Sequence, residues 1–339
     1  MVKVSVGHIG VQGDVMVSML TSVGGWGVDH EMGHKLDIEV RTIGEVTNNM
    51  IPQYSSYYYH APNKRIPFES HTFKNVIAVN NNDYYEGGYF EKLAVFWQLE
   101  MIYPGYWGKL NRQYRENNVV LDANNDSNDK LNQMAKYSSL ALELDLTEHF
   151  ERHGFWVSDE TKEFLSQYPK PELKTWYANY DYIEYEGEGF TENPDLDVNI
   201  TRESDAIKLT FSINEANQND ILGYEIFKEG ELIGFTSTNQ FIDRSAPNKE
   251  SVDYTVVPYD KRLNQGKAIV INTETPSLKL QQTEIHLKLG EEFDPMTFVR
   301  AISYDGQDIS EKIKVNNKLT SMKKEFIQSN IQLKTMELS

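Results

Sequence analysis

Hydrophobic residues recur at helical spacing through much of the first half of the chain. After Gly88, apolar residues follow one another mostly three or four positions apart, which places them on one face of a helix; they are Phe90, Leu93, Phe96, Trp97 and Met101. Similar patterns predict helices over 104–114, 131–144, 147–153 and 158–168, the last two with Thr147 and Ser158 as N-caps. The first half is therefore predicted to be mostly helical.

The hydrophobic period changes after Pro169. Apolar and polar residues then alternate, as in half-buried strands, within 207–211, 223–227 and 254–259. Residues 228–231 predict a hairpin turn that leads into a further strand over 232–235. Short strands joined by turns at this spacing predict a β-sandwich.

The chain is predicted to carry two β modules after its helical part. Residues 186–272 resemble a fibronectin type III module. Residues 273–339 resemble the beginning of a small bacterial immunoglobulin-like module with an irregular tail, and 285–290 and 298–304 are its strand candidates. The predicted fold is therefore multidomain, with a mainly α domain at 1–185 followed by β-sandwich modules.

Composition and charge narrow the range of partners. Hydrophobic residues make up 39% of the 339 residues and aromatic residues 12%, which is enough for packed cores. With 51 acidic and 33 basic side chains, the formal net charge is −18, which disfavours nucleic acid and anionic membranes as partners. No apolar run reaches the roughly 18 residues of a membrane span. The absence of cysteine excludes disulfides and thiolate metal ligands.

The strongest chemical signal is the sequence His-Glu-Met-Gly-His at 30–34. On a helix predicted over 27–39, His30 and His34 are one turn apart, so both imidazoles can bind one zinc ion, with Glu31 beside them as general base. Catalytic zinc usually takes a third protein ligand and leaves one position for water, and Glu45 is the candidate. The alternative is a chance occurrence of the motif on a solvated helix face.

The surrounding residues resemble the enhancin-type gluzincin metallopeptidases, the M-sixty peptidase family. The resemblance rests mainly on Trp-Gly-Val-Asp-His-Glu-Met-Gly-His at 26–34 and Gly-Glu-Val-Thr-Asn-Asn at 44–49, and extends to about residue 185. It implies a mainly α gluzincin zinc-metallopeptidase domain in which Glu31 activates water. The Zn²⁺ ligands that it implies are His30, His34 and Glu45.

The resemblance also implies a substrate and an incomplete domain. Family members cleave heavily O-glycosylated proteins such as mucins, which implies a glycoprotein substrate. The catalytic domain of this family usually carries a substantial portion before the zinc helix. Because the motif begins here at His30, we expect part of the domain to be missing.

Three residues near the motif are candidates for substrate binding: Trp26, Asn48 and Asn49. Trp26 could stack on a sugar ring, and the asparagines could hydrogen-bond to substrate. The alternative is structural: Trp26 packs beneath the zinc helix, and the asparagines cap or turn the chain.

Other polar residues near the motif could support catalysis. Asp37 and Glu39 could accept hydrogen bonds from a ligand imidazole, but we expect both to be solvent-facing charges. A peptidase also needs a donor for the developing oxyanion, and Tyr57, Tyr58, Tyr59 or His60 could supply it.

The sequence therefore predicts a zinc-dependent endopeptidase that acts on glycosylated proteins such as mucins. Two alternatives remain: a non-catalytic protein that binds glycans or a host surface, and a structural adhesin whose β modules carry the function. We expect a monomer that binds no nucleic acid and spans no membrane. The first residues are too polar for a secretory signal, but the resemblance and the β modules favour an extracellular or cell-surface location.

Overall fold

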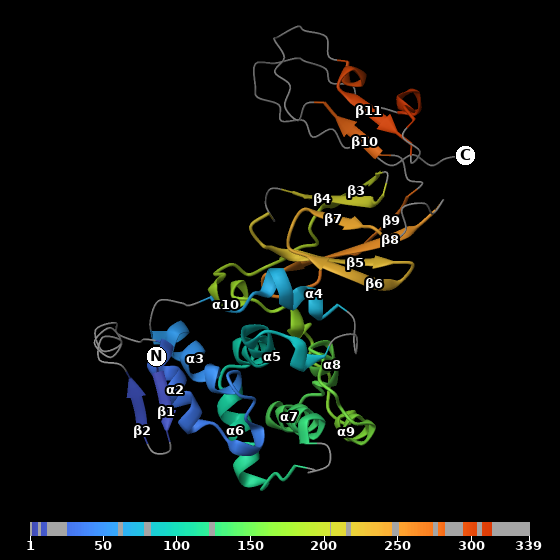
Figure 1. Ribbon diagram of the computed structural model, residues 1–339. Coiled ribbons are helices and arrows are strands. Elements are labelled where there is room, and N and C mark those ends of the chain that lie inside the picture. The colour runs from blue at the N-terminus through green and yellow to red at the C-terminus, as the bar shows by residue number, and fades with distance from the viewer. Residues whose placement is uncertain are drawn as a thin grey trace.

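The structure is a computed structural model that describes residues 2–5, 8–11, 26–59, 64–77, 83–121, 126–203, 205–214, 218–245, 251–273, 277–281, 294–303 and 307–313. Helices make up most of the first half, and antiparallel sheets follow them (Figure 1). The predicted change from helix to strand is therefore confirmed.

The helices of the first half surround one buried helix. They are α2 (Trp26–Leu36), α3 (Met50–Tyr59), α4 (Phe73–Asn75), α5 (Tyr89–Ile102), α6 (Tyr106–Glu116), α7 (Asp126–Leu142), α8 (Thr147–Arg152), α9 (Asp159–Leu165) and α10 (Asp181–Glu184). Every residue of α5 from Leu93 to Met101 is buried. The pattern predicted one buried face, but α5 is apolar around most of its circumference and is covered on all sides.

Short helical turns link these helices. They are η1 (Glu39–Arg41), η2 (Thr47–Asn49), the π-helical η3 (Phe68–Thr72), η4 (Tyr84–Glu86) and η5 (Thr175–Tyr177). Ser158 caps α9 as predicted, because its hydroxyl accepts a hydrogen bond from the backbone N–H of Thr161. The predicted cap at Thr147 is wrong: Thr147 is the first helical residue, and the Asp145 carboxylate accepts from its N–H.

Two antiparallel sheets follow the helices. One has the strand order β3–β4–β7 and the other β6–β5–β8–β9. Their bounds are β3 (Leu196–Arg202), β4 (Ile207–Ile213), β5 (Ile221–Lys228), β6 (Glu231–Thr236), β7 (Gln240–Asp243), β8 (Asp253–Asp260) and β9 (Ile269–Asn272). The predicted hairpin joins β5 to β6 through Glu229 and Gly230, both at positive φ, as a two-residue type I′ turn requires.

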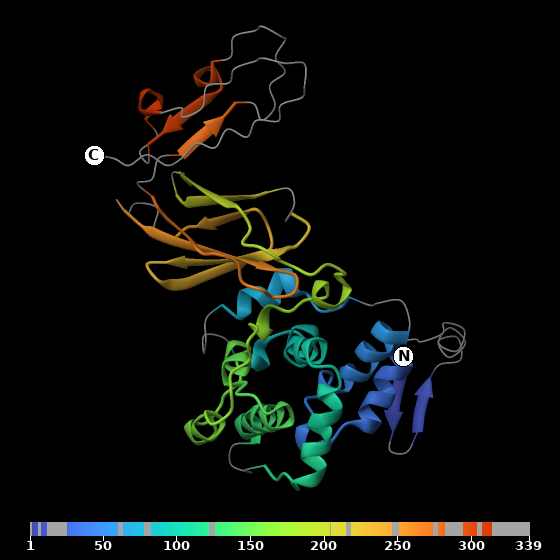
Figure 2. The same cartoon turned by 180° about the vertical axis from the view of Figure 1, so that it is seen from behind.

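One apolar cluster lies between the two sheets, and a second joins the four-stranded sheet to the helices. The first includes Val198, Leu209 and Ile226. The second is the core of the helical part, and it also contains residues of the sheet, among them Phe235 and Tyr259. In both cartoon views, α4 and α10 lie between the remaining helices and the sheets (Figure 2). The predicted boundary at 185 therefore falls beside a shared core.

Two hairpins complete the described part of the chain. β1 (Val2–Ser5) pairs with β2 (His8–Val11), and β10 (Ser277–Leu280) pairs with β11 (Val299–Ile302). Two further turns, η7 (Pro295–Thr297) and η8 (Ser310–Lys312), flank β11. The strand candidate at 285–290 and the tail after 313 lie outside the described residues. The assignments of fibronectin type III and immunoglobulin-like modules stay predictions.

Candidate metal centre

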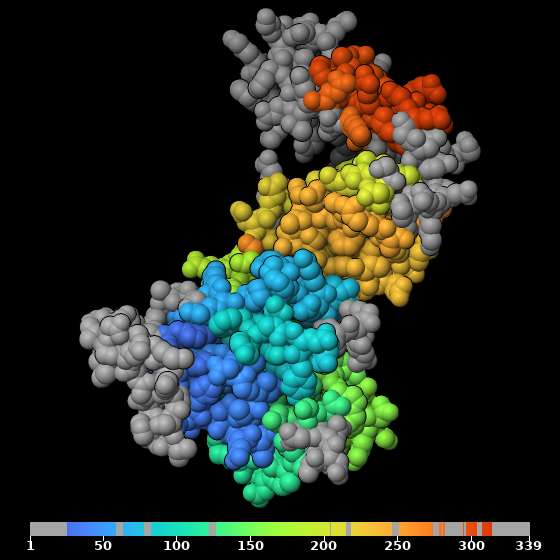
Figure 3. Space-filling view, in the orientation of Figure 1, coloured from blue at the N-terminus to red at the C-terminus, as the bar shows by residue number. Residues whose placement is uncertain are grey.

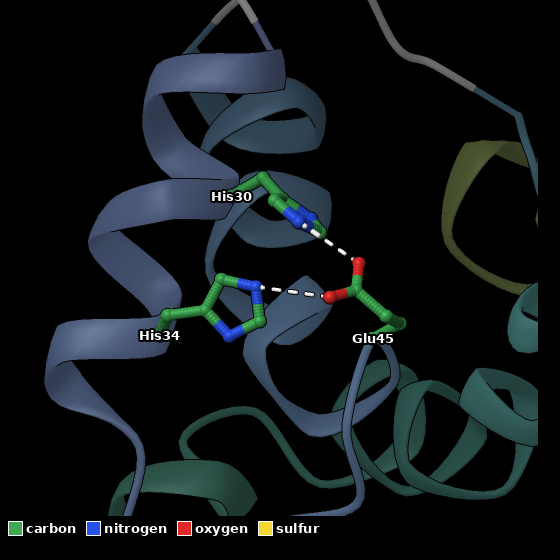
Figure 4. A group of neighbouring side chains, drawn as sticks. All are labelled: His30, His34 and Glu45. Carbon is green, nitrogen blue, oxygen red and sulfur yellow. Dashed lines mark ion pairs between the residues drawn. The ribbon is translucent and has the colours of Figure 1, made fainter. Parts of the chain in front are cut away.

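Three side chains of the motif region converge in space. His30 and His34 project from the same side of α2, and Glu45 faces them from the turn between η1 and η2 (Figure 4). One nitrogen or oxygen atom from each residue lies within 4.8 Å of the other two. Among the described residues, this is the one group of histidine, aspartate and glutamate side chains with such spacing.

The donor atoms fit a zinc ion. His30 Nε2 lies 3.2 Å from Glu45 Oε2, and His34 Nε2 lies 3.3 Å from Glu45 Oε1. In a tetrahedral site with metal–ligand bonds of about 2.0–2.1 Å, neighbouring donor atoms are about 3.3 Å apart. Two imidazoles and one carboxylate are also a donor set that zinc prefers.

Glu31 lies beside this group on α2. Its side chain is buried, and its Oε2 atom has no hydrogen-bond partner among the described residues. A buried carboxylate oxygen without a partner is costly unless it binds something that the protein itself does not supply. A water molecule between Glu31 and a metal ion would satisfy it.

The turn that carries Glu45 is held by buried polar contacts. Glu45 has a φ of 61°, a left-handed conformation that non-glycine residues rarely adopt. Two residues further on, Thr47 Oγ1 donates a hydrogen bond of 2.5 Å to Asp37 Oδ2. Asp37 Oδ1 in turn pairs with Arg41 Nη2 at 2.6 Å, and the Arg41 guanidinium lies 4.1 Å from the ring centre of Trp107.

These contacts correct one prediction. The side chain of Asp37 is only 3% exposed, so it is not the solvent-facing charge expected from the sequence. Glu39 is exposed, as expected. Arg41 and Thr47 were not identified from the sequence at all. The i,i+4 spacing of Asp37 and Arg41 was the available signal, although it does not distinguish a buried pair from a solvated one.

Asn48 and Asn49 lie beside the imidazole rings of His30 and His34. Their exposed fractions are 1% and 4%, so both side chains are enclosed by protein. The amide nitrogen of Asn48 lies 3.2 Å from His34 Nε2 and between 3.1 and 3.4 Å from the two ring nitrogens of His30. Asn49 Oδ1 lies 2.7 Å from His30 Nδ1. The structure thus brings both asparagines against the imidazoles, and their predicted role in substrate binding stays a prediction.

Trp26, at the N-terminal end of α2, contacts one aromatic and one cationic side chain. Trp26 makes an edge contact with Phe90, and the Arg65 guanidinium lies 4.4 Å from the centre of the Trp26 indole. Trp26 is partly exposed, and Arg65 is exposed. Arg65 is a candidate residue for ligand binding that no motif in the sequence indicated.

The oxyanion candidates fall into two groups. Burial raises the pKa of Tyr57 to about 12, so this phenol keeps its proton and remains a hydrogen-bond donor. Tyr58 is more exposed, and its pKa is raised, first by burial. The side chain of Tyr59 and the whole of His60 lie outside the described residues.

Residues 8–154 match the family described as peptidase M60, enhancin and enhancin-like. The chain carries a peptidase M60 domain. This match lies within the 1–185 segment that resembles gluzincins, and it includes the complete motif from His30 to Glu45. A match to the M60 metallopeptidase family implies a bound metal, and this agrees with the metal-binding side chains of this site.

Three solved structures from Clostridium perfringens are similar to the chain. The M60 catalytic domain of ZmpC, in complex with the sialyl T antigen, is 36% identical with a TM-score of 0.71; the match covers 80% of this chain and 54% of that one. The ZmpB metallopeptidase is 37% identical with a TM-score of 0.69, and the shares are 78% and 53%. The catalytic module of the metalloprotease ZmpA is 33% identical with a TM-score of 0.67, and the shares are 80% and 53%.

The chain with its M60 domain thus spans about half the length of these solved structures. No curated protein sequence matches it significantly. In the part of the chain that the structure describes, no helix is both long enough and apolar enough to cross a membrane.

Proposed function

We propose that this protein is a zinc-dependent endopeptidase that acts on glycosylated proteins. The observation that carries the proposal is the convergence of His30, His34 and Glu45 beside the unpartnered carboxylate oxygen of Glu31. The M60 match supports the peptidase class. The similar ZmpC domain was solved with the sialyl T antigen, which supports substrates that carry O-linked glycans such as those of mucins.

Each of the proposed site residues has its own role in the reaction. His30, His34 and Glu45 would hold the zinc ion, which when bound would polarise the scissile carbonyl and make a neighbouring water molecule more acidic. Glu31 accepts the proton of that water as it attacks the peptide carbonyl carbon. Glu31 then donates the proton to the amine nitrogen as the peptide C–N bond breaks, so the Glu31 carboxylate is restored at the end of the cycle.

The substrate surface lies around the N-terminal end of α2. Trp26 is partly exposed, and the exposed guanidinium of Arg65 lies over one face of its indole. An aromatic face packs against the apolar side of a sugar ring. We therefore place glycan contacts at Trp26. An extracellular or cell-surface location, the monomeric state and the accessory role of the β modules remain predictions.

The Glu31→Gln variant tests the proposal. Glutamine keeps the shape of the side chain but cannot take up the proton, so we expect zinc to remain bound while cleavage of an O-glycosylated mucin is lost. Glu39→Gln is the matched control, because this exposed glutamate lies nearby on η1 and should affect neither property. Zinc is measured by elemental analysis and cleavage by gel electrophoresis.

Two results would contradict the proposal. One is a Glu31→Gln variant that cleaves mucin as fast as the parent protein. The other is a zinc-loaded parent protein that binds the glycoprotein without cleaving it, which would favour the non-catalytic glycan-binding alternative.

A further inference from the structure

Asn49 joins two of the three proposed zinc ligands. Its Nδ2 donates a hydrogen bond of 2.6 Å to the backbone carbonyl of Glu45, and its Oδ1 lies 2.7 Å from His30 Nδ1. Asn49 belongs to η2 and is 4% exposed, so water hardly competes for either contact. We propose that Asn49 is a positioning residue that fixes the tautomer of His30 and ties its ring to the turn that carries Glu45.

The two contacts together determine the orientation of the Asn49 amide. A backbone carbonyl can only accept a hydrogen bond, so the NH₂ group of Asn49 must face Glu45. Its oxygen then faces His30. Because this oxygen is also only an acceptor, His30 Nδ1 must carry the hydrogen.

The assigned tautomer leaves the lone pair of His30 where a metal needs it. A neutral imidazole carries only one N–H, so Nε2 is unprotonated in this tautomer. This nitrogen is the atom 3.2 Å from Glu45 Oε2. The Asn48 amide nitrogen is farther from this ring, at 3.1 Å from Nδ1 and 3.4 Å from Nε2. Asn49 Oδ1 makes the shorter contact, at 2.7 Å from Nδ1, and it therefore determines the tautomer.

The same amide also supports the unusual backbone of Glu45. A left-handed conformation is unfavourable for a non-glycine residue and persists only where its surroundings hold it. The bond from Asn49 to the Glu45 carbonyl is one such restraint. One side chain therefore links the orientation of an imidazole on α2 to the backbone of the proposed third ligand.

The metal part of this inference rests on the proposed function, but the tautomer part does not. Partners that orient a ligand histidine typically contribute 10–100-fold to metal affinity. We therefore expect Asn49→Ala to weaken Zn²⁺ binding by roughly this factor. Asn132→Ala is the matched control, because Asn132 is a buried, hydrogen-bonded asparagine of α7 that contacts Ser158 instead of the site.

The experiment has two readouts. Zn²⁺ affinity is measured by competition with a chromogenic chelator. The ¹⁵N shifts of the His30 ring, recorded on the metal-free protein at alkaline pH, report which nitrogen carries the hydrogen. We expect the parent protein and Asn132→Ala to show hydrogen on Nδ1, and Asn49→Ala to show a mixture of tautomers. Asn49→Asp keeps the acceptor for His30 but loses the donor to Glu45. It should therefore retain the tautomer of the parent protein but bind Zn²⁺ more weakly than the parent protein does.

The outcomes separate the two proposals. An Asn49→Ala variant with the parent's tautomer and parental Zn²⁺ affinity would overturn the positioning role, whatever its activity. A parent protein that binds no Zn²⁺ would overturn the proposed function, while a tautomer that depends on Asn49 would still support the positioning role. Circular dichroism establishes that each variant is folded.

Discussion

Gly33 lies directly against the backbone of Asn48. A Cβ atom at residue 33 would be 2.1 Å from the Asn48 carbonyl oxygen and 2.9 Å from its carbonyl carbon. The glycine between the two histidines of the motif therefore allows α2 to approach η2. This approach brings the imidazoles within reach of Glu45 and Asn49.

Replacement of this glycine should disturb the site as well as the fold. In Gly33→Ala, the added methyl group meets backbone that cannot move aside as a side chain could, and overpacking of this kind costs about 1–3 kcal/mol. We expect the free energy of unfolding to fall by this amount and Zn²⁺ affinity to fall at least about tenfold, as for other disturbed metal sites. Urea unfolding and chelator competition measure the two effects.

A second helical glycine provides the control. A Cβ atom at Gly108 in α6 would meet nothing within 4 Å. Because alanine is favoured over glycine in helices by up to about 1 kcal/mol, Gly108→Ala should be neutral or stabilising. Equal effects of the two substitutions would contradict the role assigned to Gly33.

Loss of Asp37 alone should destabilise the fold more than loss of Asp37 and Arg41 together. Arg41 is 1% exposed, and its Nε and Nη1 atoms have no hydrogen-bond partner among the described residues, so Asp37 is its main compensation. Asp37→Asn leaves a buried positive charge, which typically costs about 3–5 kcal/mol. We expect the midpoint of urea unfolding to fall accordingly and Zn²⁺ binding to weaken, because Asp37 also anchors Thr47.

Removal of both charges tests this explanation. The double variant Asp37→Asn/Arg41→Met no longer buries an unpaired charge and should recover much of the lost stability. If the double variant is as unstable as the sum of both single variants, the two side chains do not act as a pair.

Two buried histidines should make the fold sensitive to acid. His149 Nε2 donates to the Val95 carbonyl while Nδ1 accepts from Thr175, and His153 Nε2 donates to Gln98 Oε1. Burial lowers the pKa of His149 to about 4 and that of His153 well below its usual value. Both rings are therefore neutral in the folded protein at neutral pH.

The direction of the pH effect follows from proton uptake. In the unfolded chain these histidines bind protons near pH 6.5, but folded His149 binds one only near pH 4. Stability is therefore complete above about pH 6.5 and falls as the pH is lowered towards 4, by about 3 kcal/mol for His149. Thermal unfolding across this range measures the slope. His149→Gln should reduce it, whereas His71→Gln, at an exposed position, should leave it unchanged.

The four-stranded sheet and the helices should unfold together. Phe235 of β6 stacks on Tyr177 with 4.1 Å between ring centres, and it also contacts Phe73 of α4. Phe235→Ala should cost about 3–5 kcal/mol. All five tryptophans lie between residues 26 and 176, so their fluorescence reports on the helical half only.

Tryptophan fluorescence therefore tests this coupling directly. If the two parts share one core, Phe235→Ala lowers the unfolding midpoint seen by tryptophan, although the substitution lies in the sheet. Val270→Ala is the control, because Val270 of β9 is 70% exposed. An unchanged tryptophan transition in Phe235→Ala would show that the sheet unfolds independently.

The sequence by itself determined the local features of this protein. Four-residue spacing on a helix places His30 and His34 on one face, and alternation of apolar and polar residues locates β4, β5, β6 and β8. These patterns are readable because each depends on the geometry of a few consecutive residues. The strands β3, β7 and β9 were not predicted, and Asp37 was wrongly predicted to face solvent.

Only the tertiary structure decided the relationships between distant segments. The approach of η2 to Gly33, the contact of Asn49 with His30 and the burial of Asp37 each depend on how the turn after α2 folds back. The second apolar face of the sheet likewise finds its partner among the helices. Such contacts are decided by the packing of the whole chain, because an identical local sequence can face either solvent or protein.

Residues 64–77 contact both α5 and β6. In the space-filling view, this part of the chain lies between the rest of the helical half and the sheets (Figure 3). No local pattern in 64–77 indicates this double contact. The sequence therefore indicated the candidate residues for the chemistry, and long-range packing decided which of them are held in position by their neighbours.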